Sequence, residues 1–354
     1  MQDNAKGPQQ MRTRHRAALA AALTVATAVF AATALAANSA KVSVTTAGTA
    51  TTLHFSVPAS TDPIAVINIY VPTGYSANLG AASGATIGNV DATANGHDVG
   101  LTLPLSGPVT ADNPATHTAD VCSPGTHAAV WNLNLSVAGQ TLVLPLYVDP
   151  TSGAAAALGA YQMRICLPPW DTPVGSPGRA FEGAQLLDAK FTVNNIFSGA
   201  PSTLAVWHTL FTPFNPGAGT LNFAGTFEAR ALVGTPSLTI KATKKNGKYA
   251  VGGKVSEGGQ GVAGVGVTVL RGNSATRVIK VGSATTIANG AWASSGKLVG
   301  KKPVYFKASA SVPERDATAT GCATPLPATI APGGCVSATL SAWSVTSPVA
   351  KLTP

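Results

Sequence analysis

The chain has 354 residues, of which 45% are apolar and only 10% are charged, with 37 glycines, 25 prolines and a formal net charge of +9. Soluble domains usually carry about 25% charged residues. This composition therefore disfavours the usual surface of a soluble enzyme and is typical of an exported β protein with many turns. The sequence also contains no phosphate-cradling loop and no nicotinamide-binding fingerprint.

The first predicted element is an export signal. Three arginines between residues 12 and 16 form a cationic start, residues 17–35 are apolar and uncharged, and residues 34–36 (ALA) suit signal peptidase. An uncleaved anchor is the alternative, because about 20 apolar residues can span a bilayer. The Ala- and Thr-rich composition favours cleavage. We therefore expect a signal peptide at residues 1–37, no membrane span after its removal, and an extracellular or cell-surface location.

After the leader, apolar and polar residues alternate with period two, which predicts β-strands, and helical signals are nearly absent. About nine strands are expected in residues 38–232, consistent with a large antiparallel sandwich. The hairpin at residues 129–148 places Trp131, Leu133 and Leu135 on one face. The predicted strands are residues 51–57, 64–71, 99–105, 129–137, 141–148, 160–167, 186–193, 204–211 and 220–231.

Charge divides the remaining chain near residue 233. Residues 38–232 contain five basic and ten acidic residues, whereas residues 233–354 contain fourteen basic and three acidic residues, a net charge of +11. The Gly- and Pro-containing segment 233–237 is a plausible linker, so we expect two domains, residues 38–232 and 233–354. In the second, the predicted strands are residues 237–242, 249–255, 278–281, 303–310 and 336–345, with a further hairpin at residues 285–294.

Part of the second domain resembles a known family. Residues 261–267 (GVAGVGV) are followed by a hairpin pattern formed by Thr285, Thr286, Asn289, Gly290 and Trp292. Over residues 236–310 this resembles bacterial Ig-like and carboxypeptidase-regulatory-like β-sandwich modules, although Ala288 stands where many members have Asp. The resemblance implies a stalk, spacer or adhesion module without catalytic residues. We therefore expect an all-β protein with two antiparallel, Ig-like β-sandwich domains in tandem after the signal peptide.

Four cysteines in an exported chain predict two disulfides. Three pairings are possible, and we favour Cys122–Cys166 with Cys322–Cys335, because each pair lies within one expected domain. A metal site formed by these residues is the weaker interpretation, since no CxxC spacing occurs.

Three long loops, residues 78–95, 107–127 and 168–179, are the candidates for ligand binding. In the last of them, Trp170 lies beside Asp171 and precedes Arg179, an arrangement that can stack on a sugar ring. A tryptophan folded back over the core is the alternative, because this residue type is mostly buried.

The 107–127 loop also gathers His117, Asp120 and His127, which we include among the candidate ligand-binding residues. Histidine, aspartate and cysteine can all hold metals, but the spacing here matches no metal motif. We therefore expect no metal and no cofactor, and a surface loop held by the Cys122 disulfide.

The basic second domain predicts an anion-binding surface. Its candidate residues are Lys244, Lys245, Lys248, Lys301 and Lys302. Outside the cytoplasm the expected partner is an anionic cell-envelope polymer or glycan, and not a nucleic acid. Two alternatives remain: the basic face docks on the acidic first domain, or the lysines guard strand edges against association.

Together these features predict a secreted or surface-associated, non-catalytic binding or structural protein that engages envelope polymers or glycans. No catalytic residues are assigned, since no G-x-S-x-G motif occurs. The alternative is a secreted hydrolase or glycan-active enzyme with an Ig-like accessory domain, whose site would lie in the first domain. The oligomeric state is not predicted.

Overall fold

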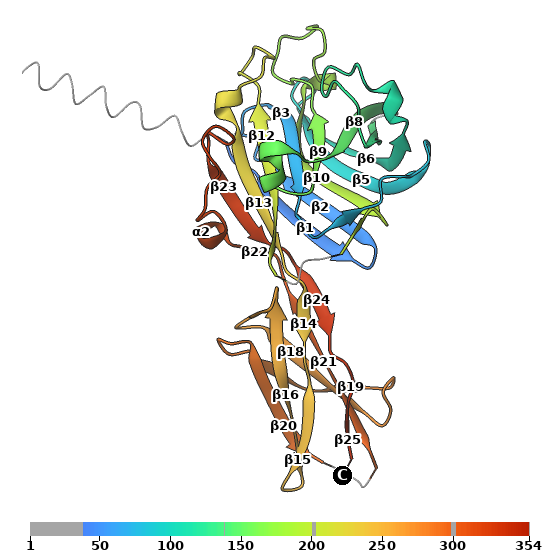
Figure 1. Cartoon of the computed structure of the whole chain (residues 1–354), viewed down its shortest axis with the longest axis vertical. Coiled ribbons are helices and arrows are strands. Elements are labelled where there is room, and N and C mark those ends of the chain that lie inside the picture. The colour runs from blue at the N-terminus through green and yellow to red at the C-terminus, as the bar shows by residue number, and fades with distance from the viewer. Residues whose placement is uncertain (1–37, 138, 200–202, 299–301, 354) are drawn as a thin grey trace, which may run out of the picture. The chain divides into compact units, whose positions relative to one another are not determined.

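A computed structural model describes residues 38–353 except residues 138, 200–202 and 299–301, so the expected leader lies outside the described residues. Nearly all of its elements are β-strands (Figure 1), which confirms the all-β expectation. Within the described residues, the strands form one 13-stranded sheet, two five-stranded sheets and one two-stranded sheet. We call the part built on the 13-stranded sheet the large lobe, and the part built on the five-stranded sheets the small lobe.

The large lobe takes its strands from two separate stretches of the chain. Its neighbours run in the order β1-β2-β10-β5-β6-β7-β8-β9-β3-β12-β13-β23-β22, and β4 (Ser76–Ala77) pairs separately with β11 (Phe197–Ser198). The strands are β1 (Lys41–Ala47), β2 (Ala50–Ser56), β3 (Ile64–Val71), β5 (Thr86–Gly96), β6 (Leu101–Asp112), β7 (Ala129–Val137), β8 (Gln140–Pro150), β9 (Tyr161–Cys166), β10 (Ala184–Asn194), β12 (Ala205–Pro213), β13 (Phe227–Val233), β22 (Arg315–Asp316) and β23 (Cys335–Leu340).

The large sheet curls back on itself. Open sheets rarely exceed about ten strands without curling, and here β1 approaches β13 and β23 from the opposite end of the strand order. Two hydrogen bonds join these ends: the Val44 N–H donates to the Ser341 hydroxyl at 3.2 Å, and the Ser337 hydroxyl donates to the Ala40 carbonyl at 2.6 Å. The curled sheet encloses one apolar core, in which Trp131 and Trp207 are fully buried.

Short helical turns join the strands. Among the described residues, four are short 3-10 helices and the fifth is a short α-helix. They are Pro114–Thr116, Gly153–Ala157, Phe181–Gly183, Phe223–Gly225 and α2 (Thr318–Gly321).

Two long strands of the large lobe, β1 and β5, and the two-residue strands β4, β11 and β22 were not expected from the sequence. β6 also continues to Asp112, into the loop expected at residues 107–127. β1 occupies residues before the first predicted strand, and β5 lies where a loop at residues 78–95 was expected. The β5 segment (TIGNVDATANG) is rich in Gly, Asn and Asp, which have low strand propensity. Its position between β10 and β6 supplies ladder hydrogen bonds on both sides, and these override the local preference.

The small lobe consists of two five-stranded sheets around one apolar core that includes Val267, Trp292 and Phe306. One sheet contains β14 (Pro236–Leu238), β15 (Lys241–Lys245), β16 (Lys248–Glu257), β17 (Gln260–Gly261) and β20 (Ala291–Lys297). The other contains β18 (Gly266–Gly272), β19 (Ile279–Thr285), β21 (Val304–Val312), β24 (Trp343–Thr346) and β25 (Ala350–Leu352).

The single strand expected at residues 336–345 is two strands in two different sheets. β23 pairs with β13 in the large lobe, and it does so in parallel, unlike the other ladders of the described strands. β24 pairs with β21 in the small lobe. Between them, the backbone N–H of the buried Ser341 bonds to the Leu232 carbonyl at 3.1 Å. The large sheet therefore extends beyond the boundary expected between residues 232 and 233.

Candidate functional site

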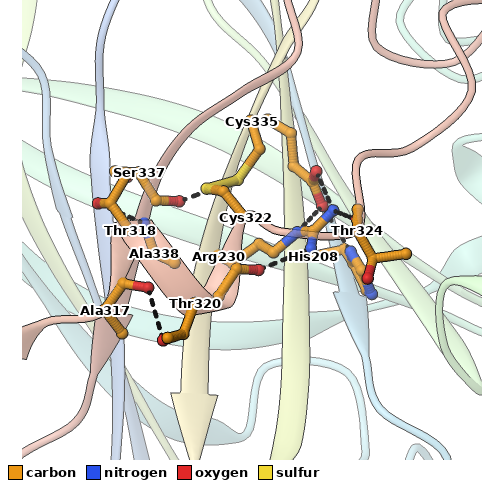
Figure 2. The surroundings of a disulfide bond; sticks show 12 residues. His208, Arg230, Ala317, Thr318, Thr320, Cys322, Thr324, Cys335, Ser337 and Ala338 are labelled. Carbon is orange, nitrogen blue, oxygen red and sulfur yellow. Dashed lines mark hydrogen bonds and ion pairs between the residues drawn. A yellow bond between two sulfur atoms is a disulfide. The ribbon is translucent and has the colours of Figure 1, made fainter.

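Both expected disulfides are present. Cys122–Cys166 ties the loop before β7 to the end of β9, with the Cα atoms 5.9 Å apart. Cys322–Cys335 ties the segment after α2 to the start of β23, with the Cα atoms 5.5 Å apart (Figure 2). By loop-closure entropy, the shorter of the two loops alone accounts for about 3 kcal/mol of stabilisation.

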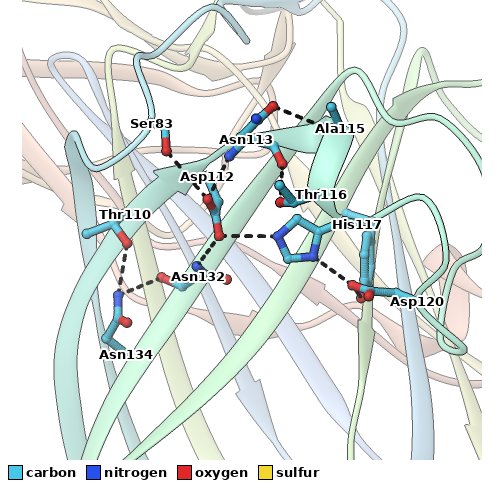
Figure 3. Close-up of polar contacts among 11 residues, drawn as sticks. Ser83, Thr110, Asp112, Asn113, Ala115, Thr116, His117, Asp120, Asn132 and Asn134 are labelled. Carbon is cyan, nitrogen blue, oxygen red and sulfur yellow. Dashed lines mark hydrogen bonds and ion pairs between the residues drawn. The ribbon is translucent and has the colours of Figure 1, made fainter.

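A polar cluster forms where the first disulfide holds its loop (Figure 3). His117 bonds through Nδ1 to Asp120 at 2.7 Å and through Nε2 to Asp112 at 3.2 Å. The Asn132 amide also donates to Asp112, and the Tyr147 hydroxyl donates to Asp120, each at 2.7 Å. Both carboxylates therefore accept hydrogen bonds from more than one side chain, and the histidine bridges them.

The cluster shifts the ionisation of its members. Burial alone would lower the pKa of His117, but its hydrogen bonds to Asp120 and Asp112 outweigh burial and raise it above the ordinary value of 6.5. Burial would raise the pKa of Asp112, but hydrogen bonds from Asn113, His117 and Asn132 lower it. Hydrogen bonds from Tyr147 and His117 lower the pKa of Asp120. The cluster is therefore a charged unit with a protonated histidine at mildly acidic pH.

Replacing His117 by asparagine is expected to lower the free energy of unfolding by about 1–2 kcal/mol near pH 5.5, and by much less above pH 8. Because the pKa of His117 is higher in the folded state than the ordinary value of 6.5, the protonated histidine stabilises the fold fully below pH 6.5. This contribution is lost as the pH rises through the folded-state pKa. Asp112 and Asp120 have lowered pKa values, so their carboxylates stabilise the fold above about pH 3.9, the ordinary aspartate pKa. This contribution is lost as the pH falls through the lowered pKa values.

Urea denaturation across pH 4–9 measures this dependence. His54→Asn removes a more exposed histidine–aspartate pair and should change stability by less than about 1 kcal/mol. An effect of His117→Asn that does not vary with pH would contradict the assignment.

His127 lies beside the same cluster but has separate partners. Its Nδ1 is 2.8 Å from Asp149 and its Nε2 is 2.8 Å from the Ser123 carbonyl, while its ring packs against Tyr147 with 4.8 Å between centroids. Among the described residues, no group of three or more His, Cys, Asp and Glu side chains is arranged to hold a metal ion. The contacts of this cluster hold the loop in place.

The loop at residues 168–179 brings together two of its three candidate residues. Arg179 forms a bidentate pair with Asp98, with N–O distances of 2.5 and 2.7 Å, and its Nε donates to the Thr172 carbonyl at 2.7 Å. The Trp170 ring stacks on His97, with 4.0 Å between centroids and 8° between planes. His97 therefore covers one face of the ring of Trp170, the residue that the sequence suggested could stack on a sugar.

Two further contacts fix this loop. Gln185, which is 3% exposed, bonds to His97 Nε2 at 2.9 Å and donates to the Ala59 carbonyl at 3.0 Å. Asp171 forms no ion pair with Arg179 and accepts from the Gly217 N–H at 2.5 Å. The hydrogen bonds from Arg179 lower the pKa of Asp98, so the pair stays ionised at neutral pH. We call the Asp98–Arg179 pair and the His97–Trp170 stack the latch.

The latch closes one side of a cavity of about 420 Å³ in the large lobe. Trp170 and Arg179 line it, together with Gln185 and residues of β5, β6, β7 and β8. Sequence reasoning found Trp170 and Arg179 through loop length and composition. It missed His97 and Asp98, because they are more than 70 residues away and only the fold brings them together.

Three of the five candidate lysines of the small lobe lie at one hairpin. Lys244, Lys245 and Lys248 are exposed at the turn between β15 and β16, where Asn246 and Gly247 both have positive φ (51° and 69°), as the Asn-Gly turn signal predicts. Lys302 is exposed, and Lys301 lies outside the described residues. The structure adds Lys297, which stands directly opposite Lys248 on the neighbouring strand β20.

A buried charged cluster that the sequence did not suggest lies in the large lobe (Figure 2). Glu228 is fully buried on β13 and accepts two hydrogen bonds from Arg230, at 2.8 and 2.7 Å, and one from His208 at 2.5 Å. Burial would raise the pKa of Glu228, but these partners lower it. Arg230 also donates to the carbonyls of Gly321 and Thr324, and so holds the segment that carries the second disulfide.

A serine hydrolase site would place a histidine against a serine hydroxyl. The histidines of the described residues bond instead to carboxylates, amide side chains and a backbone carbonyl. The described histidines therefore give no support to a serine hydrolase.

No family model matches this chain, and no curated protein is significantly similar to it. The likeness of residues 236–310 to Ig-like modules therefore stays a prediction. In the part of the chain that the structure describes, no helix is long and apolar enough to cross a bilayer.

Proposed function

We propose that this chain is an exported, non-catalytic binding protein that attaches to an anionic polymer of the cell envelope through its small lobe. Export rests on the leader pattern of residues 1–37 and is supported by the two disulfides, which are usual in oxidising compartments. In this proposal the small lobe is an Ig-like spacer with a basic face, and the large lobe provides specific recognition.

One observation carries the attachment: a row of lysines across three neighbouring strands. Lys245 of β15 stands opposite Lys248 of β16, which stands opposite Lys297 of β20. All three are exposed, and none forms an ion pair with a described residue. Like charges directly opposite each other on a sheet destabilise it. In this proposal, an anionic polymer that lies across the row reduces the repulsion between the lysines, and this favours its binding there.

Replacing all three lysines of the row by glutamine tests the proposal. Each lysine near an anionic surface contributes about 1 kcal/mol, so the triple variant should bind sodium polyphosphate roughly a hundredfold more weakly. The matched control, Lys190→Gln with Lys254→Gln and Lys280→Gln, removes the same charge from exposed sites outside the row. Titration at low and high salt provides the measurement, and wild-type binding should weaken steeply with salt.

Equal losses in the two triple variants would show that total charge, and not the row, governs binding. The absence of binding by the wild-type protein, both to polyphosphate and to isolated cell envelopes at low salt, would refute the proposal.

A further inference from the structure

The cavity behind the latch has walls built from the apolar faces of two hairpins. The aliphatic side chains point inward at every second position of each strand, as period-two alternation requires. Six wall residues are Leu103 and Leu105 of β6, Leu135 and Val137 of β7, and Leu142 and Leu144 of β8. Three of these, Leu103, Leu142 and Leu144, are only partly buried although they belong to the apolar interior. An apolar ligand in the cavity would bury the remaining exposed surface of these three leucines.

The volume of the cavity suits a chain molecule. Ligand pockets usually span about 300–1,000 Å³ and are mostly apolar with a few polar groups, and this one measures about 420 Å³. Because a water molecule occupies about 30 Å³ of liquid, the cavity holds about 14 groups of that size. This corresponds to the carbons of a lauroyl or myristoyl chain.

The mouth of the cavity is formed by the latch and by exposed apolar side chains. Phe181, which follows the latch loop, lines the cavity and is 52% exposed. Leu101 lies on the same face of β6 as Leu103 and Leu105 and is 60% exposed. Apolar surface thus continues from the interior to the outside, which provides an entry path for a hydrocarbon chain.

The latch also contains one unused donor, on a residue that lines the cavity. The Trp170 Nε1 atom is inaccessible to solvent and has no hydrogen-bond partner among the described residues. A buried donor left unpaired costs about 1–3 kcal/mol, and a ligand oxygen that displaces the atoms now covering Nε1 would recover that cost. Arg179 is the only Lys or Arg of the same loop, residues 168–179, and it is already paired with Asp98.

The charge around the mouth selects between neutral and anionic head groups. Asp98, Asp171 and Glu182 all lie close enough to Arg179 to interact with it electrostatically, and Asp62 lines the cavity. Three carboxylates therefore lie near one guanidinium group, and that of Asp62 lies on the cavity wall. Such surroundings repel a fatty-acid carboxylate and accept an uncharged hydroxyl or ester oxygen.

We propose that this cavity binds a neutral, single-chain amphiphile of the monoacylglycerol or fatty-alcohol class. The hydrocarbon chain lies among the leucines of β6, β7 and β8, and a hydroxyl or carbonyl oxygen accepts the Trp170 Nε1 hydrogen. This site is independent of the lysine row, and its ligand differs in chemistry from the polymer proposed above.

The first arm of the test uses 1-lauroylglycerol, titrated into the full mature protein by calorimetry. We expect saturable binding with one ligand per chain and a negative heat-capacity change, the marker of apolar burial. Ala92→Phe, which fills the cavity from β5, should weaken binding about tenfold or more. Ala115→Phe adds the same bulk at an exposed site away from the cavity and should leave affinity unchanged. Leu142→Asn, a partly exposed wall position, repeats the test if Ala92→Phe does not fold.

The second arm tests the head group. Trp170→Phe removes the donor but keeps an aromatic ring against His97, and should weaken binding of 1-lauroylglycerol about tenfold. Trp343→Phe, which removes another buried and unpartnered indole N–H in the small lobe, is the matched control and should have no effect. Laurate, with the same chain and a carboxylate head, should bind more weakly than the glycerol ester at neutral pH.

Three results would overturn the inference. The first is no saturable binding of 1-lauroylglycerol by the wild-type protein, and the second is unchanged binding in both cavity variants. The third, tighter binding of laurate together with no effect of Trp170→Phe, would assign the cavity to an anionic lipid and refute the neutral head group. The lysine-row variant should bind 1-lauroylglycerol like the wild type, so failure here is distinguishable from failure of envelope attachment.

Discussion

Replacing Arg230 by methionine is expected to lower the free energy of unfolding by about 3–5 kcal/mol, since it leaves a buried charge without its main partner. The Glu228 carboxylate is fully buried and depends on Arg230 for two of its hydrogen bonds. The variant also frees the carbonyls of Gly321 and Thr324. Urea denaturation with both disulfides intact measures the loss.

Two further variants make this test specific. Glu228→Gln combined with Arg230→Met leaves no stranded charge, so it should lose less stability than Arg230→Met alone. Lys190→Met, at an exposed site of the same sheet, should change stability by no more than about 0.5 kcal/mol. If Arg230→Met loses less than about 1 kcal/mol, the cluster does not hold the segment that carries the second disulfide.

The second large effect is expected from Gly107→Ala, at about 3 kcal/mol or more. A Cβ atom at Gly107 would lie 1.7 Å from the Asn134 carbonyl oxygen on β7, so the backbone of one strand must move. The β6–β7 ladder pairs Ser106 with Ser136 and resumes at Val109 with Leu133, so Gly107 lies between two paired positions. The backbones of the two strands cannot separate there without breaking this pairing. The displaced strands are those that form two walls of the cavity.

Gly266→Ala is the matched control, because Gly266 also lies in a strand but a Cβ there meets nothing within 4 Å. With an ordinary backbone conformation, this substitution should stabilise the protein by about 0.4–1 kcal/mol through the unfolded state. Chemical denaturation of the two variants should therefore give opposite signs. Similar stabilities would mean that β6 and β7 separate more easily than the structure indicates.

Much of the fold followed from local patterns. The alternation in β7 correctly placed Trp131, Leu133 and Leu135 on the buried face, and all three are at most 5% exposed. The Asn246-Gly247 turn is also where the sequence predicts it. These features depend only on near neighbours along the chain, which is the information a single sequence carries most directly.

Features that depend on distant partners were not predictable. β5 is a strand because β6 and β10 pair with it, although its composition indicates a loop. Residues 336–345 alternate like one strand, yet the pairing of β23 with β13, about 100 residues earlier, ends that strand at Leu340.

The residues of the candidate site also fall into those predictable from nearby sequence and those placed by distant partners. Loop length and residue type pointed to Trp170 and Arg179, and charge excess pointed to the lysine hairpin. The partners that give these residues a role, His97, Asp98 and Lys297, come from strands and turns far away in sequence. The cavity itself is formed by aliphatic side chains that are indistinguishable in the sequence from ordinary core residues.

The parallel pairing of β13 with β23 sets an order of events during synthesis. A polypeptide emerges from the ribosome N-terminus first, and residues 335–340 follow most of the small lobe. Until they emerge, one edge of β13 is unpaired, and open strand edges promote aggregation. Truncated translation products that end before residue 335 should therefore be degraded rather than accumulate as a stable fragment. Completion of the large sheet therefore waits until residues 335–340, which follow most of the small lobe, have been made.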